Sequence, residues 1–177
     1  MKKSVGSDLE NLLYRQQRFV LIPGCITNTV VRRCLALVSD LNQPKWRNGD
    51  NSCHSWKELS GPSLVELNTI VPSHRLEAIL HRKLRASFQW LNVYSGCQFI
   101  PGHRDAGGDA HLLACISVPR PDEGGQFWLD RKNRIIPLGV GDVLLFEASN
   151  LLHGTTPMSL DSNSKRVTLS TRLWFEN

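Results

Sequence analysis

Apolar residues in the first half of the chain recur mainly at helical spacing. Residues Phe19–Ile22 form an apolar run that a Pro-Gly pair ends, which predicts a short strand followed by a turn. Thr27 or Asn28 can cap a helix after it, because apolar residues recur every three or four positions over residues 30–41. Ser73 can cap a second helix. The apolar stripe of that helix consists of Leu76, Ile79, Leu80 and Leu84.

After residue 87 the apolar period shortens from that of a helix to that of a strand. Phe88, Trp90, Asn92 and Tyr94 then share one face of a strand. Further short strands are expected at about residues 98–105, 111–118, 125–130, 134–138, 142–148, 153–157 and 166–175. Helices followed by many strands predict an α+β fold, with a helical part at about 1–87 and a β-sandwich or barrel-like core at about 88–177.

Residues 42–63 interrupt this pattern with a long polar stretch that contains Trp46 and Trp56. A long loop in a compact domain is often a lid or a binding loop. A surface loop held in place by its two tryptophans explains the same composition. The sequence leaves both interpretations open.

The composition is that of one ordinary globular domain over residues 1–177, with 41% hydrophobic and 21% charged residues. No apolar run approaches the ~20 residues that span a bilayer, and no apolar stretch follows the basic start as in a secretion signal. The five cysteines are odd in number and lack C-x-x-C spacing, which favours reduced, buried thiols in the cytoplasm. No membrane partner is expected, and the oligomeric state stays open.

The formal net charge is +5, and the basic excess lies in the first hundred residues. A basic surface of this kind is compatible with an anionic partner such as nucleic acid. A solvated basic surface without such a partner is the simpler interpretation of the same excess.

The candidate chemistry begins with His103 and Asp105, which lie two residues apart and can face one ion from the same side of a strand. His153, which follows an apolar strand, is the candidate third ligand. Two histidines and one carboxylate form the facial triad of non-haem Fe(II) oxygenases, which leaves positions open for other ligands. A histidine in a core or turn, with no metal, is the alternative for His153.

The last predicted strand carries a second polar set. Arg166, Thr168, Ser170 and Arg172 alternate with apolar residues and therefore share one face. Two guanidiniums on a buried face need an anion, and a dicarboxylate fits because arginine binds carboxylates through two parallel hydrogen bonds. The alternative is that this face is the hydrated outside of the sheet.

Residues 88–175 resemble the double-stranded β-helix of the Fe(II)/2-oxoglutarate-dependent dioxygenases. The resemblance rests on an ordered set of motifs. These are Asn92-Val93-Tyr94, His103-Arg104-Asp105, Gly124-Gly125 before an aromatic strand, Leu152-His153-Gly154, and Arg166 placed 13 residues after His153. Residues 20–24 followed by a helix also resemble the start of prolyl-hydroxylase-like members.

The resemblance implies a role for each matched residue. His103, Asp105 and His153 hold Fe(II), and Arg166, helped by Thr168, pairs with the distal carboxylate of 2-oxoglutarate. Tyr94 and Asn92 hydrogen-bond the same cosubstrate, and Arg172 is the alternative partner for either carboxylate. The implied reaction consumes O₂, releases succinate and CO₂, and hydroxylates an unactivated C–H bond, with ascorbate as the reductant in vitro.

The branch of the superfamily stays open at this stage. A short chain favours hydroxylation of an amino acid, a small natural product or a peptide side chain. The N-x-Y and R-x5-R spacings resemble AlkB-type nucleic-acid demethylases, and the Gly-Gly strand resembles the TET/JBP branch, so nucleic-acid base oxidation is the alternative. A non-catalytic, cupin-like metal sensor is a third possibility, but it would not need the Arg166 face.

Overall fold

The structure is a computed structural model that describes residues 5–39, 47–48, 54–130 and 134–176. Its helices are α1 (Val5–Gln17), α2 (Asn28–Val38), α3 (Leu67–Ile70) and α4 (Ser73–Leu80), with 3₁₀ turns η2 (Gly61–Ser63) and η3 (Pro121–Glu123). Its strands are β1 (Phe19–Ile22), β2 (Arg47–Asn48), β3 (Ser55–Leu59), β4 (Leu84–Tyr94), β5 (Ala110–Ser117), β6 (Phe127–Leu129), β7 (Val143–Phe146), β8 (His153–Thr155) and β9 (Arg166–Phe175).

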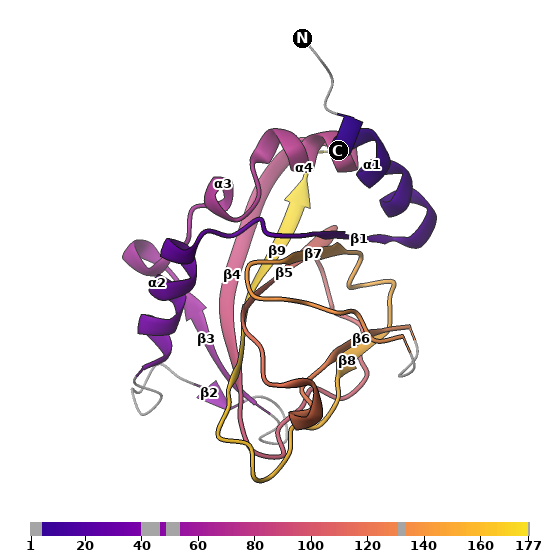
Figure 1. Cartoon of the computed structure of the whole chain (residues 1–177). Coiled ribbons are helices and arrows are strands. Elements are labelled where there is room, and N and C mark those ends of the chain that lie inside the picture. Colours follow the sequence, from indigo (N-terminus) through magenta and orange to yellow (C-terminus); the bar gives the residue numbers. More distant parts are fainter. Residues whose placement is uncertain (1–4, 40–46, 49–53, 131–133, 177) are drawn as a thin grey trace.

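The described strands form two antiparallel sheets (Figure 1). The large sheet has the strand order β1-β7-β5-β9-β4-β3-β2, and the small sheet pairs β6 with β8. The long strands β4 and β9 are neighbours in the large sheet. In their register, Tyr94 lies opposite Arg166 and Asn92 lies opposite Thr168. The α+β class expected from the sequence is confirmed.

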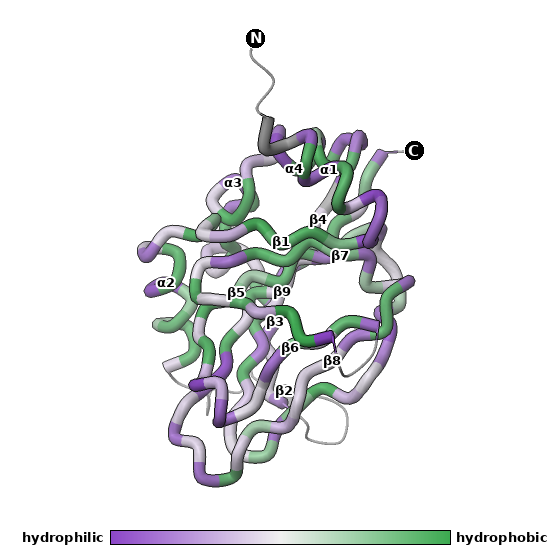
Figure 2. The backbone as a smooth tube through the Cα atoms, turned by 45° about the vertical axis from the view of Figure 1, so that its right-hand side comes forward, coloured by the Kyte–Doolittle hydropathy of each residue, from purple (hydrophilic) through white to green (hydrophobic). Residues whose placement is uncertain are grey.

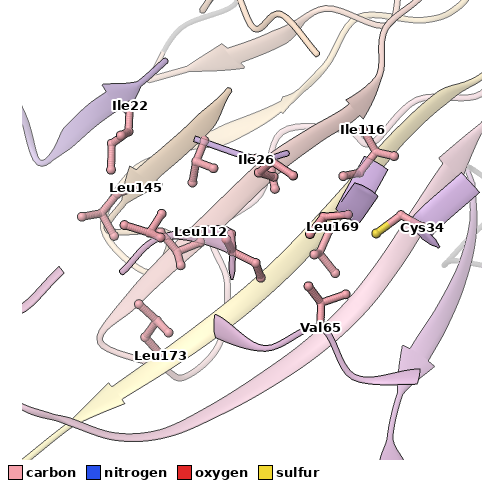
Figure 3. Close-up of a cluster of buried hydrophobic side chains, with 14 of the residues drawn as sticks. Ile22, Ile26, Cys34, Val65, Leu112, Ile116, Leu145, Leu169 and Leu173 are labelled. Carbon is pink, nitrogen blue, oxygen red and sulfur yellow. The ribbon is translucent and has the colours of Figure 1, made fainter. Parts of the chain in front are cut away.

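Each face of the large sheet has its own hydrophobic core. On the helical side, Leu112 of β5, Leu145 of β7 and Leu169 of β9 belong to one core with Cys34 of α2 (Figure 3). Residues of α4 belong to the same core. On the other side, Leu113 and Phe146 pack with residues of β6. Because side chains alternate along a strand, the apolar residues at every position of β1 and β7 let each of these strands contribute to both cores. This explains why the tube is continuously hydrophobic along β1 and β7 (Figure 2).

The alternation predicted for the last strand is present in β9. Val167 and Leu169 point into the helix-side core. The polar residues Arg166, Thr168 and Ser170 are each 1% exposed, so their face is buried. The interpretation of this face as the hydrated outside of the sheet is therefore wrong.

Both helices predicted from apolar spacing form, with small differences. Thr27 is the N-cap of α2, and its hydroxyl accepts a hydrogen bond from the backbone N–H of Val30. The second helix, α4, ends at Leu80 because His81 adopts a left-handed conformation, so Leu84 begins β4 instead of continuing the apolar stripe. Helix α1 was not predicted, since two of its leucines stay exposed and blur the stripe.

The N-terminal half is less helical than expected. Within the stretch 42–63, residues Ser55–Leu59 form β3, which pairs with β4 on one side and with the edge strand β2 on the other. The prediction of one continuous loop there is wrong, because pairing with a distant strand decided the structure of a weakly patterned segment. Trp56 lies in β3, whereas Trp46 lies outside the described residues.

Two predicted strands are reduced to single backbone bridges. Residues 98–105 pair only at His103, opposite His153, and residues 134–138 pair only at Ile135, opposite Trp128. The first segment contains Pro101, which lacks a backbone N–H and weakens strand pairing.

None of the helices in the described part of the chain is long and apolar enough to cross a membrane. Among the described cysteines, Cys34 and Cys115 are buried as expected, whereas Cys97 is exposed. Cys53 lies outside the described residues.

Candidate metal and anion site

Backbone pairing brings the three candidate ligands together. The N–H of His103 donates to the carbonyl of His153 at 3.0 Å, and the N–H of His153 donates back at 2.9 Å. The N–H of Asp105 donates to the carbonyl of Ala148 at 2.9 Å, which ties the same turn to the segment after β7. The ligand atoms of His103, Asp105 and His153 lie within 4.8 Å of one another, close enough for one ion.

Both histidines are oriented by their own backbone. Nδ1 of His103 lies 3.0 Å from the carbonyl of Pro101, and Nδ1 of His153 lies 3.0 Å from the carbonyl of Leu151. A carbonyl can only accept, so each Nδ1 carries a proton, and a ring that holds no second proton keeps a lone pair on Nε2. These Nε2 atoms lie 3.3 Å and 3.8 Å from Oδ1 of Asp105.

The two oxygens of Asp105 have different neighbours. Oδ1 faces the two candidate histidine ligands, while Oδ2 lies 2.9 Å from Nδ1 of His111 and 3.4 Å from Nη2 of Arg172. His111 is packed between Trp90 and Phe146, which fixes its ring plane. His111 and Arg172 thus hold the carboxylate through Oδ2, which leaves Oδ1 for an ion.

The electrostatics prepare these groups for a cation. Burial raises the pKa of Asp105, but hydrogen bonds from His103 and His111 outweigh it and hold that pKa well below its usual range. Burial lowers the pKa of His153 to about 4, so its ring is neutral near neutral pH. The hydrogen bond to Asp105 raises the pKa of His103, so a metal ion must compete there with a proton.

These ligands open into a cavity of about 320 Å³ between the two sheets. Its walls are mainly apolar and include Ile100, Leu113, Phe127 and Phe146. This volume lies at the lower end of the range of small-molecule sites, which is roughly 300–1,000 Å³. The cavity therefore suits a small ligand.

The guanidinium of Arg166 also lines this cavity and is 1% exposed. Its Nε and Nη2 are buried without a hydrogen-bond partner among the residues that the structure describes. Burial lowers the pKa of Arg166, a sign that its charge is poorly compensated. A buried cation with unsatisfied donors is costly, and an anionic ligand in the cavity would relieve that cost.

Polar side chains from β4 and β9 surround Arg166. Tyr94 is buried opposite Arg166, and burial raises its pKa. Asn92 donates to the hydroxyl of Ser170 at 3.0 Å, and its carbonyl oxygen lacks a partner within the described structure. All of these residues line the same cavity. This agrees with the shared strand faces that the sequence predicted for them.

Arg172 does not join Arg166. Its guanidinium carbon lies 5.4 Å from the centre of the Trp90 ring, and its Nη2 contacts Asp105. It lines a second, neighbouring cavity, so the two arginines of β9 serve different spaces. The structure thus separates the two candidates that the sequence left as alternatives for the dicarboxylate.

His111 is the site residue that sequence reasoning missed. A signal was present, because His111 interrupts the otherwise apolar strand β5, and a buried polar residue needs a partner. The partner lies on a loop six residues earlier, where no periodicity connects the two.

Gly154 allows β8 to pack closely enough to bring His153 to the cavity. A Cβ on Gly154 would lie 2.7 Å from the carbonyl oxygen of Ile100 and 2.7 Å from Cζ2 of Trp128. Glycine is therefore required for β8 to approach both neighbours and present His153 to the cavity.

Comparison of the sequence with protein-family models and with curated proteins finds no match. Comparison of the structure finds many similar solved structures. A Pseudomonas putida prolyl-4-hydroxylase has a TM-score of 0.75 at 11% identity, over 97% of this chain and 100% of that one. A Trichoplax adhaerens prolyl hydroxylase, solved with a hypoxia inducible factor peptide, has a TM-score of 0.72 at 16% identity, over 95% and 88%.

A third neighbour has a different activity. The α-ketoglutarate-dependent epimerase SnoN from nogalamycin biosynthesis has a TM-score of 0.74 at 14% identity, over 96% of this chain and 82% of that one. At such identities the likeness establishes the fold. The chain has the double-stranded β-helix fold of the Fe(II)/2-oxoglutarate-dependent oxygenases, with helices packed on its large sheet, as the sequence resemblance implied.

Proposed function

We propose that this protein is an Fe(II)- and 2-oxoglutarate-dependent dioxygenase, formed by one domain over residues 1–177 and acting in the cytoplasm. It hydroxylates an unactivated C–H bond of an amino acid, a small natural product or a peptide side chain. The observation that carries the proposal is that one cavity is lined both by the His103–Asp105–His153 cluster and by the unpartnered guanidinium of Arg166.

The residues present fit both groups. Two imidazole Nε2 atoms and one carboxylate oxygen are the ligand set of non-haem Fe(II), and three protein ligands leave coordination positions open. The unsatisfied donors of Arg166 fit a carboxylate, with Tyr94 and Thr168 as further hydrogen-bonding groups. When bound, iron and 2-oxoglutarate would supply O₂ activation, in which one oxygen atom enters succinate with loss of CO₂ and the other enters the product.

Residues of the chain orient the metal ligands and the cosubstrate, and they limit the access of water to the reaction. The backbone carbonyls of Pro101 and Leu151 fix the two imidazoles, and His111 fixes the carboxylate of Asp105. Arg166 orients the cosubstrate by its distal end, and the apolar walls exclude water from the reaction. A metal sensor without cosubstrate would have no use for a buried, unpartnered arginine, which disfavours that alternative.

The reaction outcome and substrate need a direct test. Neighbouring structures include an epimerase and a carbocyclase beside prolyl hydroxylases, so the same fold carries several oxidations. The full chain with Fe(II), 2-oxoglutarate and ascorbate is incubated with panels of amino acids, short peptides and oligonucleotides, and products are analysed by mass spectrometry. A product with one added oxygen, formed with equal succinate, supports hydroxylation.

The oligonucleotide panel tests the alternative of base oxidation. A nucleic-acid enzyme would bind oligonucleotides with an affinity that falls steeply with salt. Oxidised oligonucleotide, with no product from the small-molecule panels, would replace the proposed substrate class by nucleic acid.

A further inference from the structure

A second cavity of about 230 Å³ adjoins the candidate metal cavity and shares His54, Trp90 and Asn92 with it. Trp56 of β3 and Phe88 of β4 complete its aromatic walls, and Arg172 supplies its charge. We call this space the aromatic slot. Because it shares these walls with the cavity that the candidate ligands line, a molecule in the slot would lie next to that cavity.

The charges around the two spaces do not cancel. Among the described lining residues, Asp105 carries one negative charge, and Arg166 and Arg172 carry two positive charges. A doubly charged metal ion and a dianionic cosubstrate cancel each other, so one positive charge is left with or without them. Since unbalanced charge in a poorly solvated site is costly, the next ligand should be an anion.

Arg172 is placed to receive that anion. Its Nη2 contacts Asp105 and its guanidinium lies over Trp90, but its Nε is buried without a hydrogen-bond partner in the described structure. Gly108 leaves room for the side chain, because a Cβ there would lie 2.4 Å from Cγ of Arg172. Among the described residues, Arg172 thus keeps one N–H donor, at Nε, without a partner.

We propose that the aromatic slot is the substrate site and that it takes a small carboxylate carrying an aromatic ring. The ring packs against Trp56, Phe88 and Trp90, where aromatic pairs gain more than their buried area provides. The carboxylate pairs with Arg172 in a charge-assisted hydrogen bond. This inference rests on the proposed function, since it names the substrate class of that site.

The test is a binding series on the full chain, without oxygen, with and without Fe(II) and 2-oxoglutarate. The probes are phenylpropionate, its neutral analogue phenylpropanamide and the non-aromatic cyclohexanepropionate, followed by tryptophan fluorescence because two slot walls are tryptophans. Phenylpropionate should bind at least about tenfold more tightly than the amide. It should also bind several-fold more tightly than the cyclohexane analogue, in both states of the protein.

Two variants assign the preference to the slot. Arg172→Met should reduce the ratio of acid to amide affinity to about one. Arg32→Gln, an exposed arginine on α2, is the control. Equal binding of acid and amide by the unaltered chain overturns the inference even if Arg172→Met fails to fold. So does the absence of saturable phenylpropionate binding, or a preference that survives Arg172→Met.

Binding of 2-oxoglutarate is measured in the same samples. An acid preference without 2-oxoglutarate binding leaves the slot standing and contradicts the proposed function. Binding of 2-oxoglutarate without an acid preference contradicts the aromatic slot and leaves the proposed function standing.

Discussion

Oδ2 of Asp105 lies 2.9 Å from Nδ1 of His111, whereas Oδ1 of the same carboxylate faces the rings of His103 and His153. The two oxygens are therefore assigned to different tasks by their surroundings. An ionised carboxylate only accepts, so Nδ1 of His111 is the donor and fixes the direction of Oδ1.

Replacement of His111 should weaken metal binding without removing a ligand. We expect His111→Leu to lower the affinity for Co(II), used as an air-stable probe for Fe(II), by about 10- to 100-fold. His111→Asn places an amide N–H near the former Nδ1 and should recover much of the loss. Titration of Co(II) followed by visible absorption measures both. Equal affinities for the Leu and Asn variants would show that the hydrogen bond does not orient Asp105.

Asp105→Asn should abolish the thermal stabilisation that metal gives. A ligand that binds only the folded state raises the melting temperature, and an amide is a poor replacement for the carboxylate. Thermal unfolding with and without Co(II) should show an upward shift for the unaltered chain and none for the variant. The control is Asp122→Asn, an exposed carboxylate of η3 outside the cluster, which should keep the full shift.

Arg166→Met should separate stability from cosubstrate binding. The buried guanidinium has two unpartnered nitrogens, so its removal should raise the free energy of unfolding of the unloaded chain by about 1 kcal/mol or more. The same change should lower 2-oxoglutarate affinity by at least about 100-fold, because charge-assisted hydrogen bonds are lost. Urea unfolding and calorimetry measure the two effects. A variant that is less stable and still binds 2-oxoglutarate would remove Arg166 from the proposed role.

Gly154→Ala should displace His153. Its Cβ would lie 2.7 Å from Ile100 and Trp128 atoms, and overpacking of this kind costs about 1–3 kcal/mol. Co(II) affinity should fall together with stability. Gly24→Ala is the matched comparison, because a Cβ there meets nothing within 4 Å and only its left-handed backbone is strained. That variant should lose some stability and keep its metal affinity.

Sequence spacing was informative where the structure is local. The two-residue spacing of His103 and Asp105, and the alternation of Arg166 and Thr168 along one strand, follow from the geometry of an extended chain. His153 was a candidate because it follows an apolar strand, and the family resemblance then supported it. It lies 48 residues after Asp105, and no local spacing connects the two. These positions converge as expected, while their roles stay predictions.

The missed features depend on contacts between distant segments. His111 meets Asp105 only because β5 lies beside β7 in the large sheet, and β3 forms only because it pairs with β4. The separation of Arg172 from Arg166 follows from their places in β9, where Arg166 is the first residue and Arg172 lies six residues further along. Such relationships are set by register, which a single sequence does not reveal.

The central claim is that the histidine–aspartate cluster and Arg166 serve one reaction, and succinate release tests it most directly. Full-length protein with Fe(II), O₂ and ascorbate should convert 2-oxoglutarate to succinate even without substrate. His153→Ala and Arg166→Gln should each lose this turnover, while the exposed-residue controls His74→Ala and Arg32→Gln keep it. Undiminished succinate release by a correctly folded His153→Ala or Arg166→Gln variant would contradict the account.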